Sequence, residues 1–232
     1  MLVIPTYNER ENIRLLVERI QEVLPNFPIL FIDDNSPDGT AEEIRRLQTR
    51  YPNIQLHVRT KKLGLGSAYR EAFAKLLQNS ELQYLISLDA DLSHPPESLP
   101  QIIRLLLDHH MVVGSRYALG GKIVNWNWPR RLISRLGNFY ARIFTRVPLK
   151  DLTSGFVGYR VDALRKLELS SLNAEGYAFQ IEMKTRLFRD GARMAEVPIV
   201  FTERREGMSK FSFAIIMEAV VYPFKSWLNR HD

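Results

Sequence analysis

Short apolar runs and longer amphipathic stretches alternate along the first half of the chain. The apolar runs have the length of strands and cover residues 2–4, 29–33, 54–58, 82–88 and 111–113. Hydrophobic residues recur at helical spacing in the stretches between them, at 11–24, 40–50, 66–78 and 97–108. This regular exchange of strand and helix predicts an α/β fold built on a doubly wound, mostly parallel sheet.

The second half of the chain is less regular. A Gly-Gly turn at 120–121 and a loop rich in tryptophan and asparagine precede a basic amphipathic helix and a turn at 151–155. A helix near 178–189, a strand near 194–200 and a charged loop at 203–210 follow. No repeat or linker divides the sequence, so we expect one domain.

Neither end of the chain predicts a membrane span. The N-terminus lacks the basic and apolar leader of a signal peptide. The final apolar segment, 211–228, contains Glu218, Pro223 and Lys225, so its uninterrupted part is shorter than the ~20 residues that cross a bilayer. We therefore expect a peripheral protein whose last segment is a surface or docking helix.

Charge and cysteine content narrow the chemistry. The chain has no cysteine, so carboxylates, histidines or neutral oxygens must bind any metal, which suits a hard cation. The net charge of +6 comes from residues 109–150, which include eight basic residues and no acidic one. Such a patch indicates an anionic partner. Nucleic acid is disfavoured, because acidic strand ends would repel its phosphates.

Acidic side chains follow the predicted strands at the carboxyl ends, where such sheets bind ligands. Asp89 and Asp91 come directly after the run 82–88, and strand alternation would turn both to one side. Two carboxylates in this arrangement can hold Mg²⁺ or Mn²⁺ while a diphosphate supplies further oxygens. Aspartates are also common in turns and helix caps, so the pair alone leaves both interpretations open.

The second predicted strand also ends in carboxylates, at Asp33 and Asp34. Behind them, Asp38 and Thr40 suit a turn and a helix N-cap, and for these two we prefer that interpretation.

The first predicted strand is followed by an aromatic ring and a carboxylate. Tyr7 is suited to stack on a base and Glu9 to accept its N–H groups. Thr6 or Asn8 could at the same time cap the helix that follows.

Seven segments, in order, resemble the dolichyl-phosphate (polyprenol-phosphate) mannosyltransferases of glycosyltransferase family 2, which have the GT-A fold. They are 5–9 (PTYNE), 33–40 (DDNSPDGT), 64–66 (GLG), 89–96 (DADLSHPP), 114–117 (GSRY), 151–156 (DLTSGF) and 207–210 (GMSK). The run 89–96 is far more specific than an isolated pair of aspartates. The resemblance covers nearly the whole chain. It implies a single GT-A domain over 1–232, a Rossmann-like sheet flanked by helices, in which 1–115 binds the nucleotide sugar and 116–232 the acceptor.

The resemblance also implies roles for particular residues. Those that would bind the nucleotide sugar are Pro5, Tyr7, Glu9, Ile32, Asp34, Asp89, Ala90, Asp91, Arg204 and Lys210. Asp89, Asp91 and Ser93 would hold the divalent metal, although relatives commonly have glutamine at position 93. Arg116, Arg130 and Ser134 would bind the acceptor phosphate, and Asp91, Arg116 and Arg130 would serve catalysis. Arg204 and Lys210 match a loop that closes over the donor phosphates, for which a solvated charged loop is the alternative.

The basic helix has two stripes. Polar residues lie along one of them, namely Arg130, Ser134, Asn138 and Arg142, with Arg131, Arg135 and Arg146 beside it. Apolar residues form the other, namely Leu132, Leu136, Phe139 and Ile143. Such a helix suits an anionic bilayer surface, where each Lys or Arg contributes on the order of 1 kcal/mol. The alternative is a helix packed on the core, with a solvated basic face.

The reaction that the resemblance implies is transfer of mannose from GDP-mannose to dolichyl or polyprenyl phosphate at the cytoplasmic face of a membrane. A phosphate monoester is ionised at neutral pH, so it can attack the anomeric carbon without a general base, in one inverting displacement. Relatives that glycosylate hydroxyls usually keep a Glu-Asp pair in the region that here spans 175–182, and this chain has no such pair. A small membrane-anchoring subunit is a candidate partner.

Other functions stay open at this point. A sister enzyme would use UDP-glucose with the same class of acceptor. A non-catalytic nucleotide- or membrane-binding module would explain the basic helix but not the acidic strand ends. A phosphatase of the haloacid dehalogenase type would carry its Asp-x-Asp on the first strand, whereas here it follows the fourth apolar run. The glycine motifs of P-loop and dinucleotide-binding proteins are absent from the sequence.

Overall fold

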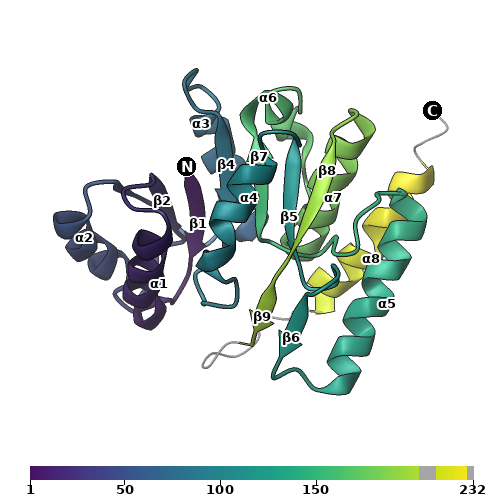
Figure 1. Ribbon diagram of the computed structural model, residues 1–232, viewed down its shortest axis with the longest axis horizontal. Helices are drawn as coiled ribbons and strands as arrows, with labels where there is room; N and C mark the ends of the chain where they lie inside the picture. Colours follow the sequence, from purple (N-terminus) through teal and green to yellow (C-terminus); the bar gives the residue numbers. More distant parts are fainter. Residues whose placement is uncertain (204–212, 229–232) are drawn as a thin grey trace.

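A computed structural model describes residues 1–203 and 213–228 (Figure 1). Its strands are β1 (Leu2–Thr6), β2 (Ile29–Asp33), β3 (Ile54–Val58), β4 (Tyr84–Ser87), β5 (Met111–Ser115), β6 (Lys122–Val124), β7 (Val157–Arg160), β8 (Met194–Pro198) and β9 (Val200–Thr202). Its α-helices are α1 (Arg10–Val23), α2 (Thr40–Arg50), α3 (Leu65–Leu76), α4 (Leu99–Leu105), α5 (Trp128–Thr145), α6 (Val161–Leu164), α7 (Gly176–Arg189) and α8 (Phe213–Leu228). Short 3-10 helices lie at Pro96–Ser98 and Leu169–Ser171.

The central sheet has the strand order β3-β2-β1-β4-β7-β5-β8. Its strands pair in parallel except β7, which runs antiparallel to both of its neighbours, β4 and β5. The mostly parallel sheet expected from the sequence is thus confirmed, whereas β7 was not foreseen. β6 and β9 form a separate parallel pair beyond the main sheet (Figure 1).

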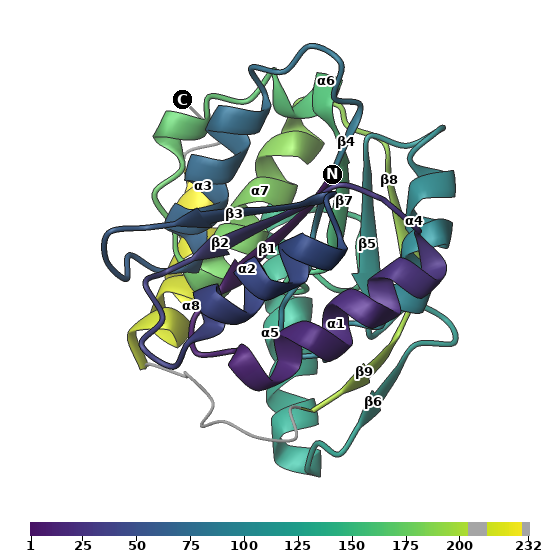
Figure 2. The ribbon, with the colours of Figure 1, turned by 90° about the vertical axis from the view of Figure 1, so that its left-hand side faces the viewer.

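Helices cover both faces of the sheet and bury a separate apolar core on each (Figure 2). On one face, α1, α2 and α4 pack on the sheet, and α1 contributes Ile13, Leu16, Val17 and Ile20 at helical spacing. On the other face, α3 and α7 supply most of the helical part of the core. This three-layer arrangement brings the carboxyl ends of the parallel strands to one edge, where the loops collect.

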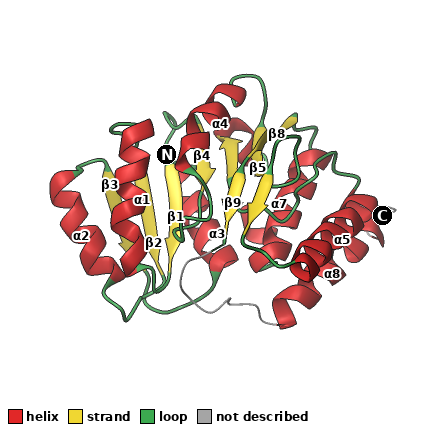
Figure 3. Ribbon diagram, turned by 60° about the horizontal axis from the view of Figure 1, so that its bottom comes forward, coloured by secondary structure: helices red, strands yellow, loops and turns green. Residues whose placement is uncertain are grey.

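Helices α5 and α8 lie side by side at one end of the molecule (Figure 3). The Tyr140 hydroxyl donates to the backbone oxygen of Val220 at 2.9 Å, and Phe144 contacts the rings of Phe224 and Trp227. No helix within the described ranges is both long enough and apolar enough to cross a membrane.

Helix α5 turns its apolar stripe outward. Leu136 and Phe139 are 57% and 61% exposed, and Leu132 and Ile143 are exposed with them. Asn138, from the predicted basic stripe, is buried instead: it donates to the Ser134 carbonyl at 2.9 Å and accepts from the Leu152 backbone N–H at 2.7 Å. The alternative of a helix packed on the core by its apolar stripe is therefore wrong.

Two predictions about helix caps also need correction. The N-cap of α2 is Gly39, at φ 88°, and Thr40 is the first helical residue, with its N–H and hydroxyl donated to Asp38. The N-cap of α1 is Glu9, without a side-chain cap, so neither Thr6 nor Asn8 caps this helix. The Thr6 hydroxyl donates instead to the buried Asp33 carboxylate at 2.8 Å.

Candidate functional site

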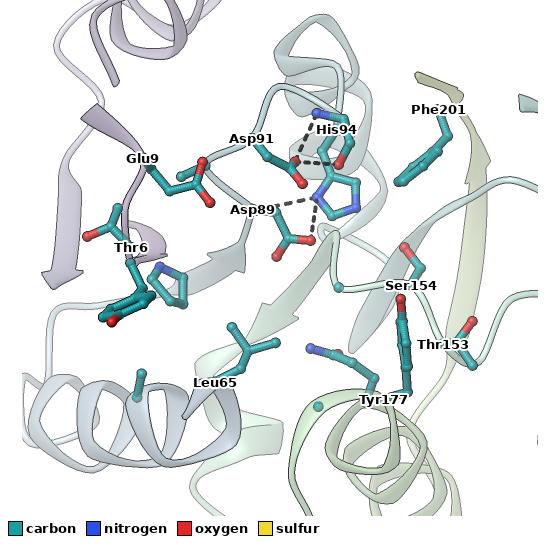
Figure 4. A pocket seen from close by; sticks show the side chains of 18 of the residues that line it. Thr6, Glu9, Leu65, Asp89, Asp91, His94, Thr153, Ser154, Tyr177 and Phe201 are labelled. Carbon is teal, nitrogen blue, oxygen red and sulfur yellow. Dashed lines mark hydrogen bonds and ion pairs between the residues drawn. The ribbon is translucent and has the colours of Figure 1, made fainter. Parts of the chain in front are cut away.

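A cavity of about 560 Å³ lies at the carboxyl ends of β1, β2, β4 and β5 (Figure 4). Its walls include most of the residues that the sequence singled out, namely Pro5, Tyr7, Glu9, Asp34, Asp89, Ala90, Asp91, Ser93, Arg116 and Arg130. Asp89, Asp91 and His94 lie together on one side, opposite Leu65 and Tyr177 (Figure 4). The fold thus gathers residues from both halves of the chain around one space.

The aspartate pair lies in a loop and not on a strand. β4 ends at Ser87, so strand alternation does not orient Asp89 and Asp91, and that part of the prediction was wrong. Asp91 accepts hydrogen bonds from the Ser93 backbone N–H at 3.0 Å and from its hydroxyl at 2.6 Å. The Asp89 backbone N–H donates to His94 Nδ1 at 3.2 Å. The loop's own hydrogen bonds therefore hold the Asp91 carboxylate and the backbone of Asp89 at the cavity wall.

The donor set at this wall fits a hard divalent cation. In the described part of the chain, no three or more His, Asp or Glu residues cluster as metal ligands. Asp89, Asp91 and the Ser93 hydroxyl supply oxygen atoms only, and a diphosphate can complete the coordination of Mg²⁺ or Mn²⁺. The set suits a metal that arrives with its nucleotide better than one held by protein alone.

At the other end of this wall, Tyr7 and Glu9 follow β1. The Lys62 ammonium lies 3.9 Å from the centre of the Tyr7 ring, in a cation–π contact. Glu9 accepts a hydrogen bond from Asn12 Nδ2 at 2.9 Å. An aromatic face and a carboxylate that line one cavity are groups that a nucleobase can use.

Asp34 accepts hydrogen bonds from the loop that faces it. Its Oδ1 accepts from the buried Arg59 at 2.5 Å, and its Oδ2 accepts from the backbone N–H groups of Leu63 and Gly64 at 3.2 and 3.0 Å. Gly64 adopts φ 95°, which favours glycine and explains the first glycine of the Gly-Leu-Gly segment. Asp34 therefore fixes the shape of the cavity wall besides lining it.

Arg116, directly after β5, is held in one orientation. Asp151 accepts from its Nε at 2.7 Å, its Nη2 at 2.6 Å and its backbone N–H at 3.0 Å, and Thr153 accepts from Nη2 at 2.7 Å. Burial opposes the charge of Arg116, but the Asp151 carboxylate outweighs it and raises the pKa of the guanidinium. Burial would raise the pKa of Asp151, and Arg116 instead lowers it. Arg116 thus stays a fixed cation at the cavity wall.

Arg130, in the first turn of α5, lines the same cavity as Arg116, and both guanidinium groups contact Trp126. Its guanidinium stacks on Trp126 at 4.2 Å from the ring centre and forms an ion pair with Glu203. The α5 N-terminus forms here because the Asn127 side chain accepts from the Arg130 backbone N–H at 3.1 Å. Two cations therefore stand at the end of the cavity nearest α5.

Two of the predicted site residues do not line the cavity, and two others lie outside the described residues. Ile32 is buried in the core on the α3 side of the sheet. Ser134 accepts a hydrogen bond from the Tyr117 hydroxyl at 2.7 Å, outside the cavity wall. Arg204 and Lys210 lie outside the described residues. The roles of these four residues stay predictions.

Several lining residues were not singled out from the sequence, namely Lys62, His94, Trp126, Tyr177, Gln180, Phe201 and Glu203. His94 lies inside the segment 89–96 and could have been chosen on that signal. Gln180 lies in the region 175–182, where a Glu-Asp pair was the expected signal. Of the two glutamates there, Glu175 accepts from the Gly66 backbone N–H and Arg70, and Glu182 accepts from Arg186 and the Ala174 backbone N–H.

Known proteins resemble this chain in sequence and in fold. An undecaprenyl-phosphate mannosyltransferase of Micrococcus luteus is 41% identical over 221 residues, which cover 95% of this chain and 90% of that protein. A polyprenol monophosphomannose synthase of Mycolicibacterium smegmatis is 41% identical over 223 residues, with coverage of 95% and 83%. Among solved structures, a Pyrobaculum calidifontis mannosyltransferase in complex with GDP-Man and Mn²⁺ superposes with a TM-score of 0.66 at 19% identity, over 98% of this chain and 63% of that one. A glucosyl-3-phosphoglycerate synthase of Mycobacterium tuberculosis superposes with a TM-score of 0.67 at 16% identity, over 99% and 77%.

The GT-A fold and these relatives define the protein as a glycosyltransferase enzyme. More particularly, the chain belongs to glycosyltransferase family 2, whose model, described as "Glycosyl transferase family 2", matches residues 1–168.

Proposed function

We propose that the protein transfers mannose from GDP-mannose to a polyprenyl phosphate, with inversion at the anomeric carbon and with a divalent metal. The observation that carries this proposal is that one cavity joins the carboxylates of Asp89 and Asp91 to the guanidinium groups of Arg116 and Arg130. A metal–diphosphate complex suits the first pair and a second phosphate suits the other. The names of the two relatives at 41% identity support a polyprenyl phosphate as acceptor.

The cavity suits an acceptor nucleophile that needs no base. Region 175–182 presents an amide, Gln180, to the cavity, while its two glutamates bind other groups of the protein. A phosphate monoester oxygen is anionic at neutral pH and attacks the anomeric carbon directly. As the new C–O bond forms, the bond to the nucleoside diphosphate breaks from the opposite side, which inverts the configuration.

The protein's part in this reaction is positioning and charge neutralisation. Arg116, oriented by Asp151 and Thr153, would hold the acceptor phosphate, and Arg130 would approach it from α5. Asp89, Asp91 and Ser93 would hold the metal, which when bound stabilises the negative charge of the leaving diphosphate.

The donor is the finer part of the proposal. GDP-mannose is favoured because both curated relatives are named for mannose transfer and the Pyrobaculum structure contains GDP-Man. UDP-glucose is the second candidate, because the Mycobacterium tuberculosis enzyme, which shares the fold, was solved with it. Glu9, next to Tyr7, favours a base with N–H donors on its edge.

The exposed surface of α5 and α8 supports a membrane-bound acceptor. Apolar side chains from both helices are exposed, with Trp128, Leu136 and Phe139 on α5 and Phe224 and Trp227 on α8. Exposed arginines on α5 add positive charge, which anionic lipids attract. We propose that these helices rest on the bilayer, at its cytoplasmic face, where they would bring the acceptor end of the cavity to the lipid.

Transfer of labelled sugar tests the function. The wild type is incubated with polyprenyl phosphate and labelled GDP-mannose or UDP-glucose, with Mg²⁺, Mn²⁺ or EDTA, and lipid-linked label is extracted. Metal-dependent mannose transfer, lost at least ~100-fold in Asp91→Ala but kept in the exposed control Asp108→Ala, is expected. Label from UDP-glucose alone would move the assignment to the sister activity. A product with retained configuration would refute the single displacement.

A further inference from the structure

We propose that Gln180 binds the sugar of the donor, with its amide N–H group donated to a ring hydroxyl, and that Lys184 positions it. This inference rests on the proposed function only in requiring a nucleotide sugar in the cavity. It adds a residue of α7 to the described residues assigned to the donor, which otherwise lie in or just after β1, β2 and β4.

The Gln180 side chain is a buried donor that faces the cavity. The residue is 2% exposed and lines the cavity. Its Nε2 is buried and makes no hydrogen bond to any residue that the structure describes. Buried polar groups in proteins nearly always have partners, so an amide without one beside a cavity indicates a ligand.

Gln180 and Asp89 face the same small space. The point that a Cβ on Gly155 would occupy lies 3.7 Å from Gln180 Nε2 and 3.4 Å from Asp89 Oδ1. A side chain at position 155 would therefore fill this space, and glycine leaves it open. A donor and an anionic acceptor are thus about equally near to one point on the cavity wall.

This pairing selects the chemistry of the ligand. A hydroxyl group both donates and accepts, so it can accept from Gln180 Nε2 while it donates to Asp89. A phosphate oxygen could accept from Gln180 but has no hydrogen to donate, so it would meet Asp89 only through a metal. A cation could bind Asp89 but finds only N–H hydrogens at Nε2. Of these three, a sugar hydroxyl alone can hydrogen-bond to both groups directly.

Lys184, one turn further along α7, fixes which way the amide points. Its ammonium donates to the Ser154 carbonyl at 2.8 Å, and it lies 3.4 Å from the Gln180 carbonyl and 3.5 Å from Gln180 Oε1. In its protonated form Lys184 has donors only, so the amide oxygen faces it. The NH₂ group is thereby turned away from Lys184, toward the cavity.

Binding measurements separate the sugar from the nucleotide. Dissociation constants of GDP, GDP-mannose, UDP and UDP-glucose are measured by calorimetry with Mn²⁺ for the wild type, Gln180→Met and Gln180→Glu. The contribution of the sugar to binding is the dissociation constant of the nucleoside diphosphate divided by that of its nucleotide sugar. We expect both variants to lower this ratio about tenfold, the effect of one hydrogen bond, and Gln180→Met to leave the binding of GDP or UDP alone within about twofold of wild type. Gln101→Met, at an exposed position of α4, is the matched control.

Each outcome decides one point. A ratio unchanged in both variants overturns the role of Gln180. So does a wild type that binds the nucleotide sugar no more tightly than the nucleoside diphosphate. Gln180→Glu keeps the shape and the oxygen that faces Lys184, so it tests the donor even if Gln180→Met fails to fold. If wild type binds UDP-glucose more tightly than GDP-mannose, the proposed donor is wrong. The role of Gln180 is then decided by the ratio of the UDP and UDP-glucose dissociation constants. Lys184→Met should lower the ratio less than Gln180→Met without changing GDP binding.

Discussion

Replacing Asp151 by asparagine should destabilise the fold more than any surface ion-pair change. Asp151 is fully buried and its partner Arg116 is 6% exposed. Both carboxylate oxygens accept hydrogen bonds from Arg116, so an asparagine would point its NH₂ group at a donor in either orientation. Removing one partner of a buried pair costs about 3–5 kcal/mol, because the other charge stays buried. For a chain of this length that lowers the melting temperature by roughly 6–20 °C.

Urea unfolding followed by circular dichroism measures this loss, with Glu97→Gln as the matched control. Glu97 pairs with Arg19 at 2.8 Å, but both side chains are substantially exposed, at 53% and 31%. Such a pair contributes only about 0–1 kcal/mol. If Asp151→Asn loses no more stability than Glu97→Gln, the buried pair does not hold this part of the fold.

The same pair predicts a dependence on acid. Arg116 lowers the pKa of Asp151 below its ordinary value of 3.8 despite the burial that opposes it. The contribution to stability is therefore present at neutral pH and is lost as the pH falls through the lowered pKa. The stability gap between wild type and Asp151→Asn should narrow only in strong acid. A gap that closes near neutral pH would refute this assignment of charge.

Three other predictions test separate parts of the structure. Burial lowers the pKa of Lys184 from 10.5 to about 7, so the unfolded chain binds more protons than the folded protein between these pH values. The difference in free energy of unfolding between wild type and Lys184→Met should therefore rise with pH in this range, by up to ~1.4 kcal/mol per pH unit. A difference that stays constant with pH in urea titrations would contradict it. Gly137→Ala, with no atom within 4 Å of the new Cβ, should stabilise α5 by about 0.5–1 kcal/mol in thermal melts, whereas Gly158→Ala meets Ile102 at 2.6 Å and should cost about 1–3 kcal/mol. Phe139→Asp should lower the affinity for anionic vesicles, measured by co-sedimentation, about tenfold or more. Leu107→Asp, equally exposed on another surface, should not lower it. Binding of wild type to the vesicles by this chain alone would also make a separate anchoring subunit unnecessary.

The strands and helices of the first half were predictable because their patterns are strong. Residues 29–32 are apolar throughout, and both faces of the sheet are in fact covered, as such runs require. β7 was missed because Val157–Arg160 is short and contains glycine and arginine. Its place between β4 and β5 depends on pairing with a strand about 70 residues away. A local sequence pattern carries no information about such a distant partner.

The site was predictable where its residues follow a strand. Asp89 and Arg116 could be found in this way, because the ends of parallel strands share one edge. Gln180 and Trp126 could not, since a helix and a loop from the second half bring them to the cavity. The orientation of α5 was likewise open, because a helical pattern separates two faces without saying which one is buried.

The outward apolar stripe of α5 has a structural cause in the same loop that holds Arg116. Asn138 and Thr145 face inward because hydrogen bonds to residues 151–153 and to the helix itself satisfy them there. That polar inner face fastens α5 to the turn carrying Asp151, and so leaves the apolar stripe for the outside. An acceptor with a charged phosphate and an isoprenoid chain needs a cation and an apolar surface close together. Helix α5 offers both, with Arg130 in its first turn at the cavity and Phe139 further along on the exposed face.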